Sequence, residues 1–129
     1  MHNTHKAIDP SLSGKVVEFS NGYAKVELKT TSQMLADSKG LIHGGFTFSA
    51  ADYCAMVAIN KPNVVLVGAD VKFLAPTKLE DTVIFEAKVL EQECPKAKVE
   101  VVGKVEDKEV FKGIFKTYTT KEHILKWKR

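Results

Sequence analysis

Hydrophobic and polar residues alternate along several stretches of the chain, and this alternation predicts β-strands. The run 14–19 is typical of a short strand, and a Ser-Asn-Gly turn signal at 20–22 separates it from Tyr23–Lys29. In the second run every other residue is apolar, as in a strand with one buried face. Asn and Gly favour the turn because both tolerate positive φ. The two runs are therefore expected to form a hairpin.

From Leu41 to Ile59 the pattern changes, because alanine, phenylalanine and methionine fill almost every position. The stretch is too long for a typical strand, so it predicts a helix that is buried on most sides. Pro62 is expected to stop this helix, since it has no backbone N–H for the next helical hydrogen bond. The preceding segment, 30–40, is polar and irregular and predicts a connection.

Four more strand-like runs follow the helix. They cover Val64–Phe73, 81–93, 97–106 and 109–120, with a turn at 106–108. One helix cannot cover so many long antiparallel strands unless the sheet curls round it. We therefore expect a single α+β domain over residues 1–129, with a core at about 14–120 and tails on both sides. Pairing with a second copy would cover the sheet edges that so small a core leaves.

Composition narrows the classes of function. The 129 residues are 44% hydrophobic and 27% charged, which is ordinary for one globular domain. A net charge of +3 is too small to indicate nucleic acid, although it suits an anionic small ligand. The sequence has no long apolar run and no signal-peptide pattern, so we expect a cytoplasmic protein without a membrane span. Cys54 and Cys94 lack metal-ligand spacing, and Cys54 is interpreted as a small core residue.

Asp52 is an isolated carboxylate inside the predicted apolar helix. No Lys or Arg lies between Leu41 and Asn60 to neutralise it locally. Aspartate is unfavourable inside helices and is rarely buried without a partner, because burial penalises its charged form and raises its pKa. A hydrogen-bonded core carboxylate is the simpler alternative. A costly group kept at such a place favours a functional role.

Gly44 and Gly45 stand where the helix is expected to begin. The first N–H groups of a helix have no intrahelical partner, and the helix dipole favours negative charge there. They would suit the oxyanion of an ester or thioester, although a simple tight turn explains the glycines equally well. Gly44 and Asp52 are eight residues apart, or about 12 Å along a helix. If both act on one carbonyl, they must come from two copies, which predicts two equivalent sites shared across a dimer.

The segment HGGFTFSAAD, residues 43–52, resembles the His-Gly-Gly-six-residues-Asp motif of hotdog-fold acyl-CoA thioesterases, in particular the PaaI-like type of the phenylacetate pathway. The segment FLAPTKLEDTV, residues 73–83, resembles the strand end that follows this motif in the family. The resemblance covers about residues 40–115. It implies a curved antiparallel sheet around one long helix, a homodimer that is often paired into a tetramer, and no metal or cofactor beyond the CoA of the substrate.

The resemblance also implies roles for single residues. Asp52 would act as nucleophile or as general base for water, while the amide of Gly44 from the facing subunit polarises the thioester carbonyl, with Gly45 as a second donor. His43 would support the loop or contact the substrate. The remaining expected contacts are Phe46, Phe48 and Tyr53 for the acyl group, and Lys72, Lys78 and Lys116 for the phosphates of CoA.

Other functions stay open at this point. The same fold includes proteins that bind acyl-CoA as a regulatory signal without hydrolysing it, so a sensor is the main alternative. The strand Val64–Phe73 lacks the Ser or Thr that some relatives carry there, which leaves those helper roles unassigned. A dehydratase is disfavoured, because no His pairs with Glu or Asp in the arrangement that such enzymes use.

The tail 121–129 carries basic residues around Trp127. Stacking and phosphate contacts by such a segment are conceivable. We favour a solvated C-terminal segment whose apolar residues Ile124, Leu125 and Trp127 dock on the domain, and we expect no nucleic-acid partner.

Overall fold

The computed structural model describes residues 1–127 of the chain. Its elements in order are α1 (Pro10–Ser13), β1 (Lys15–Ser20), β2 (Tyr23–Lys29), the short 3₁₀ turn η1 (Ser32–Met34), α2 (Gly44–Ile59), β3 (Val64–Phe73), β4 (Thr82–Glu93), β5 (Lys96–Val105), β6 (Lys108–Thr119) and the 3₁₀ turn η2 (Ile124–Lys126). Two strands before the long helix and four after it are the order that the sequence pattern predicts. The helix starts at Gly44 rather than Leu41, because Leu41 and Ile42 form isolated bridges with neighbouring loops.

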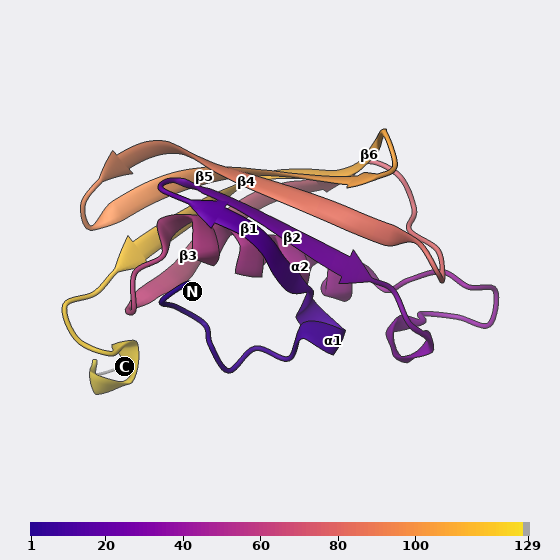
Figure 1. Ribbon diagram of the computed structural model, residues 1–129, viewed down its shortest axis with the longest axis horizontal. Helices are drawn as coiled ribbons and strands as arrows, with labels where there is room; N and C mark the ends of the chain where they lie inside the picture. The colour runs from indigo at the N-terminus through magenta and orange to yellow at the C-terminus, as the bar shows by residue number, and fades with distance from the viewer. Residues whose placement is uncertain (128–129) are drawn as a thin grey trace.

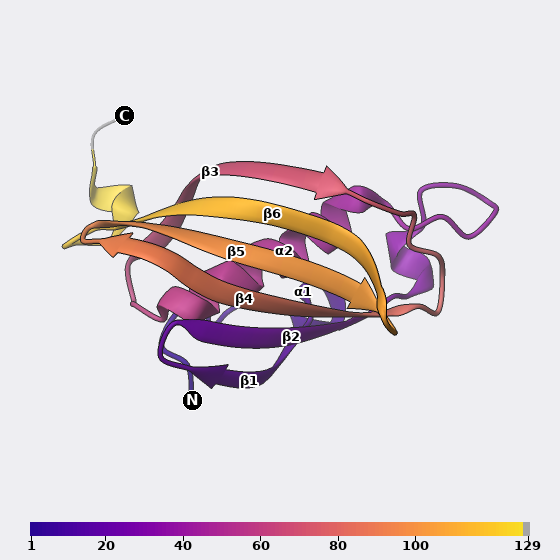
Figure 2. The same ribbon diagram turned by 90° about the horizontal axis from the view of Figure 1, so that it is seen from above.

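All six strands join one antiparallel sheet in the order β1-β2-β4-β5-β6-β3. The predicted hairpin of β1 and β2 is present, with Ser20 opposite Tyr23. Strands β1 and β3 form the two edges, and α2 crosses beneath the sheet between them (Figure 2). Each edge strand therefore has one side without a hydrogen-bonded neighbour among residues 1–127.

The sheet curves over α2, while the N-terminal segment and α1 lie on the opposite side of the helix (Figure 1). Burial from both sides explains why the helix shows no polar face: ten of its residues are buried. The core between helix and sheet is filled by Phe85, Phe111 and Phe115, all fully buried. This arrangement confirms the expected hotdog fold, with the sheet wrapped around one central helix.

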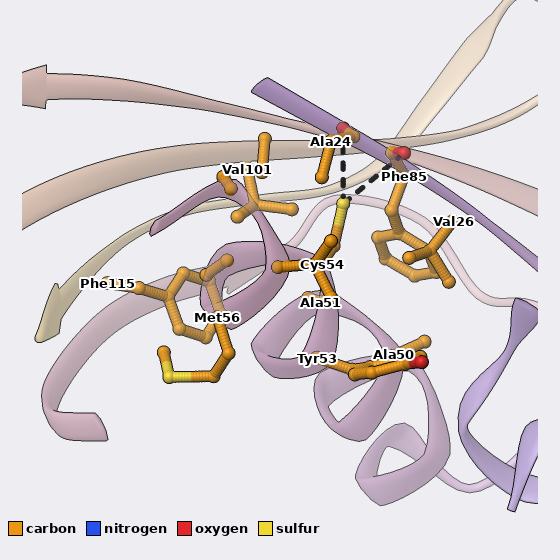
Figure 3. Packing of buried hydrophobic residues seen from close by; sticks show 14 of the residues in the cluster. Ala24, Val26, Ala50, Ala51, Tyr53, Cys54, Met56, Phe85, Val101 and Phe115 are labelled. Atoms are coloured by element: carbon orange, nitrogen blue, oxygen red, sulfur yellow. Dashed lines mark hydrogen bonds between the residues drawn. The ribbon is translucent and has the colours of Figure 1, made fainter. Parts of the chain in front are cut away.

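Cys54 lies in the middle of this core (Figure 3). Its Sγ is 3.4 Å from the carbonyl oxygen of Ala24 on β2 and 3.6 Å from that of Phe85 on β4. Burial raises the pKa of the Cys54 thiol far above its ordinary value. The residue is therefore a core thiol that packs the helix against two strands, as the sequence suggests.

The C-terminal tail only partly follows the expectation. The ring of Trp127 lies edge-on against Tyr118 of β6, with the ring centroids 5.9 Å apart. Leu125 is 82% exposed, so the expectation that it docks on the domain is wrong. Its place in the short η2 turn directs it to solvent, and residues 128–129 lie outside the described part of the chain. In residues 1–127 we find no helix with the length and apolar character that crossing a membrane requires.

Candidate functional site

Gly44, Phe48 and Asp52 follow one another at intervals of four residues on α2, so they form one row along the helix. The row begins beside the edge strand β3. A Cβ added at Gly44 would lie only 3.2 Å from Cε1 of Phe73, the last residue of that strand. Farther along, the ring of Phe48 packs against Phe115 of β6, with the centroids 5.5 Å apart. The row therefore runs along the side of the helix that faces the β3 end of the sheet.

Asp52 is half-buried in this row. Its Oδ1 atom is buried and finds no hydrogen-bond partner within residues 1–127. The simpler alternative, a hydrogen-bonded core carboxylate, is therefore not supported for this oxygen. Burial raises the pKa of Asp52 to about 6. A carboxyl group with such a pKa takes up a proton readily near neutral pH, which suits a general base.

The start of α2 leaves its first amides free. Within the described residues, neither Gly44 nor Gly45 donates its N–H to a protein acceptor, while the preceding amides of Ile42 and His43 are bound to Thr77 O (2.9 Å) and Met34 O (2.8 Å). These two bonds fix the direction in which the chain enters the helix. The free N–H groups then point out of a firmly held turn, as a site for negative charge requires.

Two side chains shape the surroundings of these amides. The imidazole of His43 packs edge-on against Phe46, with ring centroids 6.1 Å apart. A Cβ at Gly45 would lie only 2.9 Å from Nε2 of His43, so a larger residue there would displace the ring. A pocket of about 370 Å³ opens beside Gly44, and Phe73 forms part of its wall. Gly44 therefore borders this pocket directly, and glycine at position 45 leaves room for the ring of His43.

The amide of Gly44 and the carboxylate of Asp52 cannot meet within one chain. The helix is continuous between them, so they are separated by about 12 Å along its axis. The edge strand β3 exposes two large apolar side chains: Val67 is 63% exposed and Phe73 is 56% exposed. A second copy placed on this edge would bury both side chains and bring a second helix next to the first.

The structure does not gather all the predicted substrate contacts. Tyr53 belongs to the neighbouring helix row and lies under the N-terminal segment, where its hydroxyl is 3.2 Å from Nε2 of His2. Lys72 stands opposite Lys112 on the sheet, on the face away from α2. Phe46 and Phe48 are half-buried near the row, as expected for either core or substrate contacts.

Three further residues lie near the helix start and were not among the expected contacts. The ring of Phe73 lies beside Gly44, and Lys39 and Lys108 join Lys78 around a neighbouring pocket. Phe73 begins the strand-end segment that carries the family resemblance, which is the signal that could have found it. The two lysines carry no such signal, because only the tertiary fold brings their loops together.

A curved antiparallel sheet around one central helix defines the class of hotdog-fold proteins. The model of the thioesterase superfamily matches residues 39–112, more than half of the 129 residues. The chain belongs to the thioesterase superfamily.

Solved structures share this fold. A crystal structure of PH1136, an uncharacterised protein from Pyrococcus horikoshii, is 44% identical, with a TM-score of 0.96 over 97% of this chain and 96% of that one. The smu.793 protein of Streptococcus mutans, solved bound to acetyl CoA, is 21% identical, with a TM-score of 0.80 over 92% and 97%. A hypothetical thioesterase of Streptococcus pneumoniae, solved with coenzyme A, is 20% identical, with a TM-score of 0.76 over 84% and 87%. The last two show a shared fold alone.

Curated relatives have mixed names. The chain is 56% identical over 115 residues to a protein of Aquifex aeolicus named methylthioribose-1-phosphate isomerase, covering 88% of this chain but 25% of that protein. It is 28% identical over 114 residues to the transcription factor FapR of Caldanaerobacter subterraneus, covering 88% of this chain and 57% of FapR. The chain thus spans a quarter of the first relative and just over half of the second.

Proposed function

We propose that the protein hydrolyses acyl-CoA thioesters, with Asp52 as the reacting acid and the Gly44 amide as the oxyanion donor. The observation that carries this proposal is the half-buried Asp52, whose Oδ1 atom has no hydrogen-bond partner within residues 1–127 and whose pKa burial raises to about 6. Burying a carboxylate without a partner lowers the stability of the folded chain, so a carboxylate kept at such a place favours a functional role. Two relatives of the same fold that were solved with coenzyme A or acetyl CoA support the choice of thioester.

The reaction has two forms that share the same residues. Asp52 either removes a proton from water, whose hydroxyl then adds to the thioester carbon, or attacks that carbon itself and forms an anhydride that water opens. In both forms the carbonyl oxygen becomes negative, and the Gly44 N–H donates to it. The C–S bond then breaks, CoA leaves as the thiolate, and the acyl group leaves as the carboxylic acid.

The site in this proposal is assembled from two copies of the chain. Two observations support this. Gly44 and Asp52 are about 12 Å apart along one helix, and the edge of β3 is open beside the row. Two copies related by a two-fold axis would present Gly44 of each to Asp52 of the other. Each dimer would then contain two equivalent sites.

The test is release of CoA from a panel of acyl-CoAs differing in chain length and aromaticity, measured across pH. We expect turnover of at least one thioester. Because Asp52 acts in its ionised form, kcat/KM should rise about tenfold per pH unit below pH 6 and level off above it. Tight binding of acyl-CoA without turnover at any pH would contradict hydrolysis.

That contrary outcome would favour a second function, an acyl-CoA-binding regulator. The observation behind it is the similarity to FapR proteins, which reaches 33% identity over 101 residues in Staphylococcus aureus and covers 55% of that protein. A regulator would keep the pocket and the paired copies but would respond to the ligand by a change of conformation or partner.

A further inference from the structure

The loop before α2 is held against the connection between β3 and β4 by backbone hydrogen bonds. The two segments lie side by side at one end of the molecule (Figure 2). Leu79 donates its N–H to the carbonyl oxygen of Gly40 at 2.8 Å, and Ile42 donates to that of Thr77 at 2.9 Å. The second bond lies two residues before Gly44. The position of the Gly44 amide therefore depends on how firmly the β3–β4 connection is held.

Asp81 closes a tight turn in this connection. Its Oδ2 accepts the backbone N–H of Lys78 at 2.9 Å, and its own N–H donates to the carbonyl oxygen of Lys78 at 3.0 Å. Inside the turn, Glu80 has φ 78°, a conformation that favours glycine. Other residues keep such a backbone only where the surrounding structure holds it, and here the two bonds of Asp81 do so. They fix Lys78 and, with it, the neighbouring carbonyl of Thr77.

Thr30 holds the same turn from the end of β2. Thr30 is buried, and both its N–H and its hydroxyl donate to the carbonyl oxygen of Asp81, at 3.1 and 2.7 Å. Within residues 1–127, no ion pair closer than 4 Å involves Asp81. Its carboxylate therefore serves the backbone of the turn rather than a neighbouring cation.

The same kind of bond shapes the loop before α2, where Asp37 supplies the carboxylate. Its Oδ1 accepts the N–H of Lys39 at 2.9 Å and that of Leu41 at 3.2 Å. An aspartate that accepts an N–H two residues farther on forms an Asx-turn. The loop is irregular, so these side-chain bonds replace regular secondary structure just before the chain reaches Gly44.

We infer that Asp37 and Asp81 are positioning residues, whose bonds to the backbone hold the two segments together and so orient the Gly44 amide toward the oxyanion. Loops place groups less precisely than helices and strands, and a displacement of about 1 Å can cost about 100-fold in rate. The inference rests on the proposed function, because it explains how the oxyanion donor of that function is kept in place.

The experiment compares Asp37→Ala and Asp81→Ala with the matched control Asp9→Ala. Asp9 accepts the N–H of Ser11 at 2.9 Å at the start of α1, so the control loses the same kind of bond outside the two segments. We expect all three variants to melt about 2 to 5 °C below the wild type. Only Asp37→Ala and Asp81→Ala should lower kcat for the best acyl-CoA of the panel, about tenfold, with KM changed less than about twofold.

Two further comparisons separate the bond from the charge and from a general loss of stability. Asp37→Asn and Asp81→Asn keep an oxygen that can accept the same N–H, so their kcat should return to within about twofold of the wild type. In a Gly44→Pro chain, which lacks the amide, adding Asp81→Ala should lower kcat less than about twofold further, because the group that Asp81 orients is gone.

Hydrogen exchange gives a readout that does not depend on catalysis. The amide of Ile42, bonded to Thr77, should exchange at least about fivefold faster in Asp81→Ala than in the wild type, and at the wild-type rate in Asp9→Ala.

Four outcomes would each overturn the inference while thioester hydrolysis stands. They are an unchanged exchange rate at Ile42, an equal loss of kcat in Asp9→Ala, asparagine variants as slow as the alanine variants, and an undiminished effect of Asp81→Ala in the Gly44→Pro chain. A wild-type protein that cleaves no thioester would instead overturn the proposed function, and the inference with it.

Discussion

Asp52→Asn should reduce kcat for acyl-CoA hydrolysis by about 100- to 10,000-fold, the range for loss of a general acid or base. Asparagine keeps the size of the side chain but cannot accept the proton of water or form the acyl intermediate. Because the carboxylate acts on the reacting carbon, binding of the CoA portion should change little. Single-turnover CoA release, with the Kd of CoA measured in parallel, separates the two effects.

The stability of this variant is the control. The carboxyl of Asp52 has a pKa raised to about 6 in the folded chain, so it binds its proton more tightly folded than unfolded. The free energy of unfolding therefore falls as the pH rises from about 4 to 6, because the folded chain holds this proton more tightly than the unfolded chain. At pH 7 the whole of this loss of stability is present. Asp52→Asn should be at least as stable as the wild type at pH 7. A loss of activity that came with a lower melting temperature would point to a structural role instead.

Gly44→Pro should lower kcat by about 100- to 1,000-fold, because proline removes the backbone N–H that holds the oxyanion. The position tolerates proline in the helix: Gly44 is the first residue of α2, where proline is common. His43 before it has φ −64° and ψ 129°, an extended conformation that residues before proline prefer. The measurement is kcat for the best acyl-CoA of the panel.

Gly44→Ala is the matched control, since alanine keeps the N–H and adds the same Cβ. That Cβ would lie 3.2 Å from the ring of Phe73, so both variants require a small movement of this side chain. We expect Gly44→Ala to retain most of the wild-type activity. If alanine and proline were equally damaging, the effect would come from crowding against Phe73, and the amide would have no catalytic part.

Much of the fold follows from the sequence pattern. Alternation of apolar residues predicts the strands, and the mainly apolar stretch from Leu41 to Ile59 predicts a helix buried on most sides. The sequence pattern does not predict details that depend on tertiary contacts. Leu41 and Ile42 are apolar like the helix that follows, yet they pair with Lys78 and Leu35 in the loops, so the helix begins only at Gly44.

The site was predictable only in its central row. Asp52 and Gly44 stand out because an acid and a glycine pair are unusual in an apolar helix. Tyr53 is expected to contact the acyl group with Phe46 and Phe48, but one step along the helix from Asp52 turns a side chain by about 100°, toward the N-terminal segment and His2. Lys39, Lys78 and Lys108 come from three different connections of the chain, and no local sequence pattern specifies that these connections meet around one pocket.

In the proposed dimer, each active site takes its acid from one copy and its amide from the other. The most direct test is to refold Asp52→Asn and Gly44→Pro chains together in equal amounts and measure acyl-CoA hydrolysis. Half of the dimers would then be mixed, and each mixed dimer would contain one site with both groups intact, so about a quarter of the wild-type activity should return. If each site were built within one chain, every site would keep one defect. Activity no higher than that of the two separate variants, with mixed dimers verified by mass, would exclude an active site shared between two copies.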